Sequence, residues 1–122
     1  MQKTLFVTGS VFGFLSVLLG AFGAHALRAR LEPRMLEVFE TGARYQMYHA
    51  VALLLVAWAA SRWPGAVTTA SGWLMVAGTV FFSGSLYAMA LTDIRVLGAI
   101  TPIGGVCFIA GWLCLAIAAM RA

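Results

Sequence analysis

The chain has 122 residues, of which 62% are hydrophobic even without its 13 glycines, and only 10% are charged. Soluble globular domains contain roughly 45–50% apolar residues and about 25% charged residues, so this composition excludes a water-soluble fold. Disorder is also excluded, because disordered chains are poor in apolar residues and rich in charge. The formal net charge of +4 fits arginines that flank membrane spans. No basic run interleaved with aromatic residues indicates a nucleic-acid partner.

Charged residues divide the chain into four long uncharged runs. A helix needs about 20 largely apolar residues to cross a ~30 Å hydrocarbon layer, and a charge at the bilayer centre costs roughly 2.5–3.5 kcal/mol. The charges therefore mark boundaries, and the sequence predicts transmembrane helices near residues 4–27, 44–62, 66–91 and 96–120. The first run is longer than the roughly 7–15 apolar residues of a signal peptide, so we expect an uncleaved span.

The only sizeable polar segment runs from Arg28 to Arg44, between the first two predicted spans. Within it the pattern predicts a short interfacial amphipathic helix near residues 33–43, with Pro33 at its first position. The predicted apolar face consists of Leu31, Met35, Val38, Phe39 and Gly42, and the polar face of Arg34, Glu37, Thr41 and Arg44. This helix would either bind lipids or a partner, or act as a connector that shields its apolar side among the headgroups. The connector is the favoured interpretation.

The remaining connections, Arg62–Gly65 and Asp93–Arg95, are short, so consecutive spans should be antiparallel neighbours. The predicted fold is an all-α integral membrane protein, an up-down bundle of four transmembrane helices that forms a single domain over residues 1–122. The end of this bundle that we call the loop side carries Arg28, Arg30, Arg34, Arg44 and Arg95, and the terminal side carries Lys3, Arg62 and Arg121. This asymmetry favours a cytoplasmic loop side with both termini outside.

Most of the distinctive polar side chains of the predicted spans gather in the loop-side half. Intramembrane polar residues usually face the bundle interior or a water-filled cavity, and they indicate a functional site by default. The sequence therefore predicts a polar vestibule that opens toward the loop side, with the candidate residues His25, Tyr48, His49, Ser83, Ser85, Tyr87 and Thr101. Because His25 and His49 end and begin consecutive antiparallel spans, we expect them to lie close together. The alternative is that both histidines only form hydrogen bonds between helices or at helix ends.

The sequence offers little support for chemistry at this vestibule. His25 and His49 lie on different spans with no metal-ligand spacing between them, so we expect no metal site. No nucleophile elbow, phosphate loop or pair of spaced carboxylates is present. We therefore expect no catalytic residue and no cofactor.

Small residues indicate close helix packing. The first span carries a stripe of Gly9, Gly13, Ser16, Gly20 and Ala24. Similar residues occur in the third span at Gly84 and Ala88, and in the fourth at Gly98, Gly104 and Gly105. Such stripes let helix backbones approach each other, either within one chain, which is favoured, or between copies. Pro102 should distort the fourth span, because proline removes a helix hydrogen bond.

Four segments carry a resemblance to a known family. They are Gly20-Ala21-Phe22-Gly23-Ala24-His25, Tyr45-Gln46-Met47-Tyr48-His49-Ala50, Phe82-Ser83-Gly84-Ser85-Leu86-Tyr87 and Ile100-Thr101-Pro102-Ile103-Gly104-Gly105. In this order they resemble the YgdD-like family of small bacterial membrane proteins, which has eukaryotic relatives and no established reaction. The resemblance implies four spans and a location in the bacterial inner membrane.

Two functional hypotheses follow from the sequence. The favoured one is a non-catalytic membrane protein, namely a scaffold, an accessory subunit or a lipid-interacting bundle. The alternative is binding or transport of a small solute or ion through the vestibule. The expected partners are the lipid bilayer and either a second copy of the chain or another membrane protein. A hydrated cavity in the loop-side half would favour transport, and internally bonded side chains would favour the non-catalytic bundle.

Overall fold

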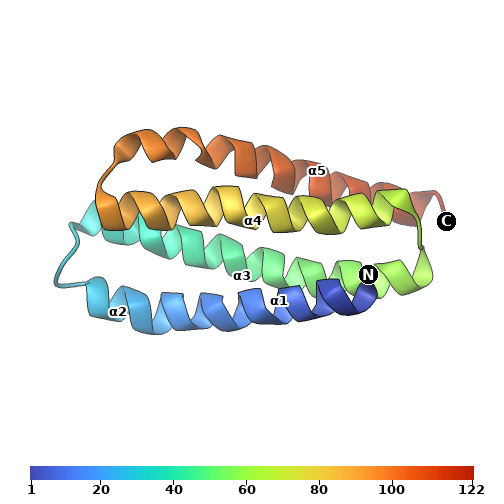
Figure 1. The fold of residues 1–122 in the computed structure, drawn as a ribbon, viewed down its shortest axis with the longest axis horizontal. Coiled ribbons are helices and arrows are strands. Elements are labelled where there is room, and N and C mark those ends of the chain that lie inside the picture. Colours follow the sequence, from blue (N-terminus) through green and yellow to red (C-terminus); the bar gives the residue numbers. More distant parts are fainter.

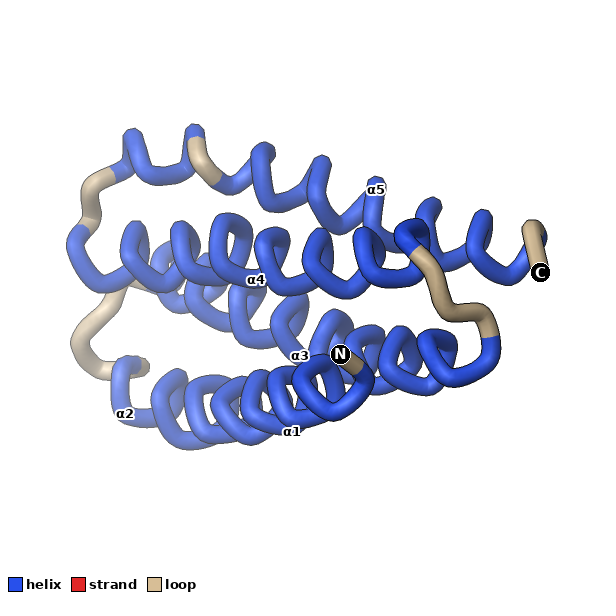
Figure 2. The backbone as a smooth tube through the Cα atoms, turned by 45° about the vertical axis from the view of Figure 1, so that its right-hand side comes forward, coloured by secondary structure: helices blue, strands red, loops and turns tan.

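The computed structural model describes all residues 1–122, and its regular structure is entirely helical. The elements in order are α1 (Gln2–Val17), the π-helical segment η1 (Leu18–Gly23), α2 (Ala24–Leu27), α3 (Pro33–Arg62), α4 (Ala66–Thr92), the 3₁₀ segment η2 (Arg95–Ala99) and α5 (Thr101–Met120). The first three elements follow one another without a break and form one helical rod. Figure 2 shows that loops occur almost only as short turns between the rods.

The four rods alternate in direction and lie in a row (Figure 1). Helix α1 packs against α3, α3 against α4, and α4 against α5, so that α1 and α5 are the outer members (Figure 1). Both termini lie at one end, and the α2–α3 and α4–α5 connections lie at the other. The up-down connectivity predicted from the short loops is therefore present, and the loop side and terminal side are real ends of the molecule.

Three helical segments are long and apolar enough to cross a membrane: Gln2–Leu27, Ala66–Thr92 and Arg95–Met120, with mean hydropathies of 2.1, 1.7 and 2.2. Helix α3 is not among them, although its 30 residues make it about 45 Å long at 1.5 Å per residue. The mean hydropathy of its apolar portion is lowered by four polar or aromatic residues: Tyr45, Gln46, Tyr48 and His49.

The predicted interfacial helix near residues 33–43 is not a separate element, because it is the first third of α3. Nothing between Pro33 and Arg62 interrupts the helix, and Pro33 occupies its first turn, where a missing N–H costs nothing. The apolar face turns toward other helices: Met35 and Phe39 are buried, and Phe39 forms a small core with Ala24 and Ala90. Packing within the molecule therefore covers the side that the sequence alone assigned to the headgroups.

The main core lies in the terminal-side half of the molecule. It joins α1, α3 and α4 through Leu5, Ala52, Leu53, Val56, Ala57 and Met75. Much of α1 and α5 stays outside any core, since only about a fifth of the residues in their most apolar stretches are buried. These outer helices expose apolar surface that a membrane would cover.

Glycines permit the closest helix contacts. A Cβ atom at Gly9 would lie 2.9 Å from the carbonyl oxygen of Ala50 on α3, and one at Gly104 would overlap the backbone nitrogen of Phe82 on α4. The stripe on α1 therefore packs within the chain, as favoured from the sequence. Gly84 and Gly105 differ, because a Cβ at either position would meet nothing within 4 Å.

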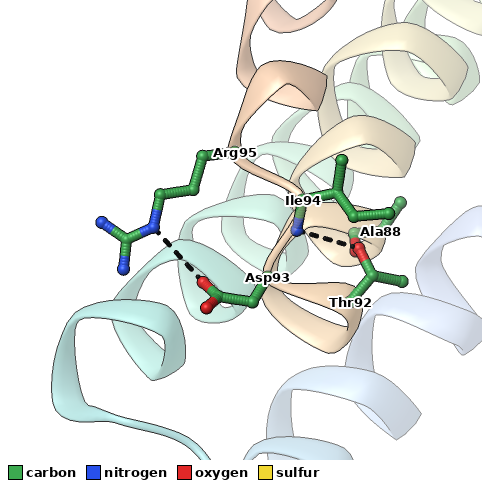
Figure 3. A network of polar contacts seen from close by, with 5 residues as sticks. All are labelled: Ala88, Thr92, Asp93, Ile94 and Arg95. Atoms are coloured by element: carbon green, nitrogen blue, oxygen red, sulfur yellow. Dashed lines mark hydrogen bonds and ion pairs between the residues drawn. The ribbon is translucent and has the colours of Figure 1, made fainter.

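The turn after α4 is held by local polar contacts, drawn in Figure 3. The Thr92 hydroxyl donates to the Ala88 carbonyl at 2.6 Å and accepts from the Ile94 N–H at 3.3 Å. Asp93 has a φ of 58°, a left-handed conformation, and its carboxylate pairs with Arg95 at 3.3 Å. The expected distortion of the last span lies just before Pro102, at the change from η2 to α5.

Candidate functional site

The predicted vestibule residues divide into exposed and internally bonded groups. His25 on α2 is exposed, and Tyr48 on α3 is 52% exposed. The remaining residues are buried or half-buried and form hydrogen bonds within the protein: His49, Ser83, Ser85, Tyr87 and Thr101. The structure therefore does not join His25 and His49 in one hydrogen-bond network.

One polar relay crosses three helices. The Tyr87 hydroxyl on α4 donates to the side-chain oxygen of Gln46 on α3 at 2.6 Å. The Gln46 amide nitrogen then donates to the carbonyl of Phe12 on α1 at 2.9 Å. Gln46 is not among the predicted site residues, although a polar amide within an uncharged run indicates a buried hydrogen bond. The relay uses both ends of the amide, so Gln46 fixes α1 and α4 against α3.

Serine and threonine hydroxyls make further links between neighbouring helices. Ser16 donates to the Ala43 carbonyl at 2.6 Å, and Ser83 donates to the Gly42 carbonyl at 2.7 Å. Ser85 and Thr101 share a hydrogen bond of 2.6 Å between α4 and α5. No buried side-chain nitrogen or oxygen lacks a partner. The buried hydroxyl groups of the loop-side half therefore link neighbouring helices.

His49 makes the most specific contacts of the group. Its Nδ1 lies 2.7 Å from the carbonyl oxygen of Tyr45, and its Nε2 lies 3.1 Å from the indole nitrogen of Trp112 on α5. Its ring stacks on Phe108 with centroids 3.4 Å apart and planes 7° apart. Trp112 and Phe108 were not predicted as partners, because the sequence alone does not show which α5 residues face α3.

These contacts define the tautomer of His49. A carbonyl only accepts hydrogen bonds and an indole N–H only donates, so Nδ1 must carry the proton and Nε2 must accept. The imidazole is therefore neutral, with both nitrogens occupied by protein groups. Neither nitrogen is free to bind a metal or to accept a proton from a substrate in this arrangement.

Four of the hollows of the molecule are open grooves on its surface. One, of about 520 Å³, is lined by aromatic residues around His49 and by Gly105. Two others follow the α1–α3 seam, with volumes of about 510 and 280 Å³. The fourth, of about 380 Å³, lies at the terminal side beside Arg62 and Arg121.

The long apolar helices and internally bonded polar groups define a helical membrane protein. Residues 19–105 match the family model described as a protein of unknown function, DUF423, and the chain belongs to this family. It is 49% identical to the UPF0382 membrane protein YwdK of Bacillus subtilis, and 47% identical to the UPF0382 membrane protein SH2409 of Staphylococcus haemolyticus, with 98% of each chain covered. No solved structure matches the chain. The family is described as one of unknown function, so membership establishes a membrane protein and no reaction.

Proposed function

We propose that this protein is a non-catalytic, lipid-interacting membrane bundle whose outer helices form its working surface. The observation that carries the proposal concerns the buried polar side chains of the loop-side half: all of them form hydrogen bonds with other protein groups. The grooves of the molecule instead open on its outer surface, and the apolar surface of α1 and α5 is available to the bilayer. The partner in this proposal is the lipid bilayer itself.

The proposal includes four membrane spans, with α3 as the second. Helix α3 is long enough to cross the hydrocarbon layer, and it packs between α1 and α4, which are both apolar enough to span. Its polar groups Gln46 and His49 are buried against these neighbours and α5. Contacts with neighbouring helices would thus shield the polar groups of α3 from lipid and compensate for its low hydropathy.

We further propose a multi-pass location in the bacterial inner membrane, with the loop side in the cytoplasm. The excess of arginines at the loop side supports this orientation, and the named membrane proteins of Bacillus and Staphylococcus support a bacterial membrane. The four segments that resemble the YgdD-like family support the same assignment.

Reconstitution into vesicles tests the proposal against the solute-pathway alternative. Vesicles containing the full chain should show the same proton, potassium and glycerol permeability as protein-free vesicles, measured by an internal pH dye, a potential-sensitive dye and osmotic swelling. Protein-dependent flux that is lost in His49→Leu, in a variant that still purifies as a folded helical protein, would refute the non-catalytic bundle and support a vestibule.

A further inference from the structure

The α1–α3 seam carries a groove with two chemically different parts. The deeper part, of about 510 Å³, is lined by small and apolar residues that include Gly9, Gly13, Met47, Val51 and Leu54. The outer part, of about 280 Å³, is lined by Ser16, Gly20, Glu40, Ala43, Arg44 and Met47. Because Met47 lines both parts, the two meet along α3. The groove therefore runs along α3 from a charged mouth near the loop side to an open apolar part nearer the middle of the helix.

The length of this groove corresponds to one lipid leaflet. Leu54 lies 10 residues beyond Arg44 on α3, which is about 15 Å at 1.5 Å per residue. Half of the ~30 Å hydrocarbon layer is the same distance. If Arg44 lies at the membrane boundary, as its place at the end of an uncharged run indicates, Leu54 lies at the bilayer midplane. Glu40 then lies one helical turn further out, at the level of the headgroups.

The charged mouth contains one cation and one anion that form no ion pair with each other. Glu40 and Arg44 line the same part of the groove, but the ion pair in the molecule is Asp93–Arg95. An arginine guanidinium matches a phosphate through paired N–H donors. The Glu40 carboxylate accepts hydrogen bonds and attracts a cation, and it would repel a headgroup with net negative charge.

We propose that this groove binds a phospholipid whose headgroup carries both a phosphate and a primary ammonium, the chemistry of phosphatidylethanolamine. The phosphate binds Arg44, the ammonium binds Glu40, and one acyl chain lies along the seam beside Gly9 and Gly13. The inference rests on the proposed lipid-interacting function and names its ligand. It commits to a zwitterionic lipid instead of an anionic lipid or a second copy of the chain, because only the zwitterion complements both charges.

Competition between lipids tests this proposal. The full chain is reconstituted in equal amounts of phosphatidylethanolamine, phosphatidylglycerol and phosphatidylcholine, mildly extracted, and analysed by native mass spectrometry for retained lipid. Phosphatidylethanolamine should be retained about tenfold over phosphatidylcholine, whose methylated ammonium cannot donate a hydrogen bond, since a charged hydrogen bond is worth about that factor. Arg44→Gln should lower this retention about tenfold, and Glu40→Gln should abolish the preference over phosphatidylcholine.

Matched variants separate the groove from general surface effects. Arg34→Gln and Glu37→Gln change exposed charges of the same helix outside the groove and should leave retention unchanged. Val51 is 50% exposed and lines the groove, whereas Val80 is 56% exposed on α4 and does not. Val51→Trp should therefore displace the lipid, while Val80→Trp should not.

Three results would overturn the inference. They are preferential retention of phosphatidylglycerol, equal retention by the Arg44→Gln and Arg34→Gln variants, and a lipid-free dimer that Val51→Trp dissociates. None of these results involves solute flux across the vesicle membrane, so each counts against the lipid assignment alone. Solute flux would instead count against the proposed function.

Discussion

Two adjacent glycines of α5 provide a controlled test of how closely α4 and α5 pack. Gly104 is buried against α4, and a Cβ there would overlap the Phe82 nitrogen and lie 2.7 Å from the Cα of Phe82. A Cβ at Gly105 would meet nothing within 4 Å. Gly104→Ala and Gly105→Ala thus make the same chemical change on the same helix, in a tight and an open environment.

The expected energies have opposite signs. Alanine in place of glycine stabilises a helix by up to about 1 kcal/mol, and Gly105→Ala should gain this amount. At Gly104 the same gain is opposed by overlap, because carbon atoms prefer about 3.5–4.0 Å and the helices must separate by about 1 Å. Overpacking of this kind costs roughly 1–3 kcal/mol. The separation also strains the Ser85–Thr101 hydrogen bond. Because both variants share the helix-propensity gain, they should differ by the overlap cost of roughly 1–3 kcal/mol.

Unfolding in mixed micelles measures this difference. The purified variants are titrated with sodium dodecyl sulfate and followed by the fluorescence of the 4 tryptophans and by circular dichroism. Gly104→Ala should unfold at a lower denaturant fraction than the unmodified protein, and Gly105→Ala at an equal or higher one. Equal stability of the two variants would refute the close approach of α4 and α5.

Three further predictions concern other parts of the molecule. His49→Leu should destabilise the detergent-solubilised protein by about 1–3 kcal/mol, because it leaves the Trp112 indole N–H without its acceptor and removes the imidazole that stacks on Phe108. The same change at the exposed His25 should alter the unfolding free energy by less than about 0.5 kcal/mol, and equal effects of the two variants would contradict the contacts of His49. A reporter fused after Ala122 should show a non-cytoplasmic C-terminus, and a cytoplasmic signal would reverse the proposed orientation. Asp93→Val should cost about 1–2 kcal/mol in the same unfolding assay, because a branched residue resists the left-handed conformation. Asp93→Asn should be nearly neutral, since asparagine tolerates that conformation and the lost ion pair with Arg95 is exposed. Similar losses in both variants would assign the effect to the ion pair.

The sequence predicted the helical class, but not the continuous helix that joins the second predicted span to the segment before it. Helices end at Leu27, Arg62 and Thr92, close to the charged residues that mark the boundaries. These features depend on local composition, which a single sequence contains. The amphipathic face containing Phe39 was visible as well, but amphipathicity does not distinguish a headgroup surface from a neighbouring helix. The packing of Phe39 against Ala24 and Ala90 resolved that choice.

At the candidate site, too, the sequence indicates some features and leaves others to the tertiary structure. Sequence position placed His49, Ser83 and Thr101 at similar depths, because depth follows from counting residues along a helix. Their partners depend on how each helix is rotated about its axis and which neighbour it meets, and no local pattern encodes this.

What the sequence determined by itself is the environment of this protein: an apolar chain divided by a few charges, with short connections that force neighbouring helices to be antiparallel. Only the tertiary structure decided what the polar groups do. It placed Trp112 against His49, and it placed Gln46 between α1 and α4, so that these side chains bond to groups on neighbouring helices. The physical reason is that burial requires every polar atom to find a partner, and those partners come from residues far away in the chain.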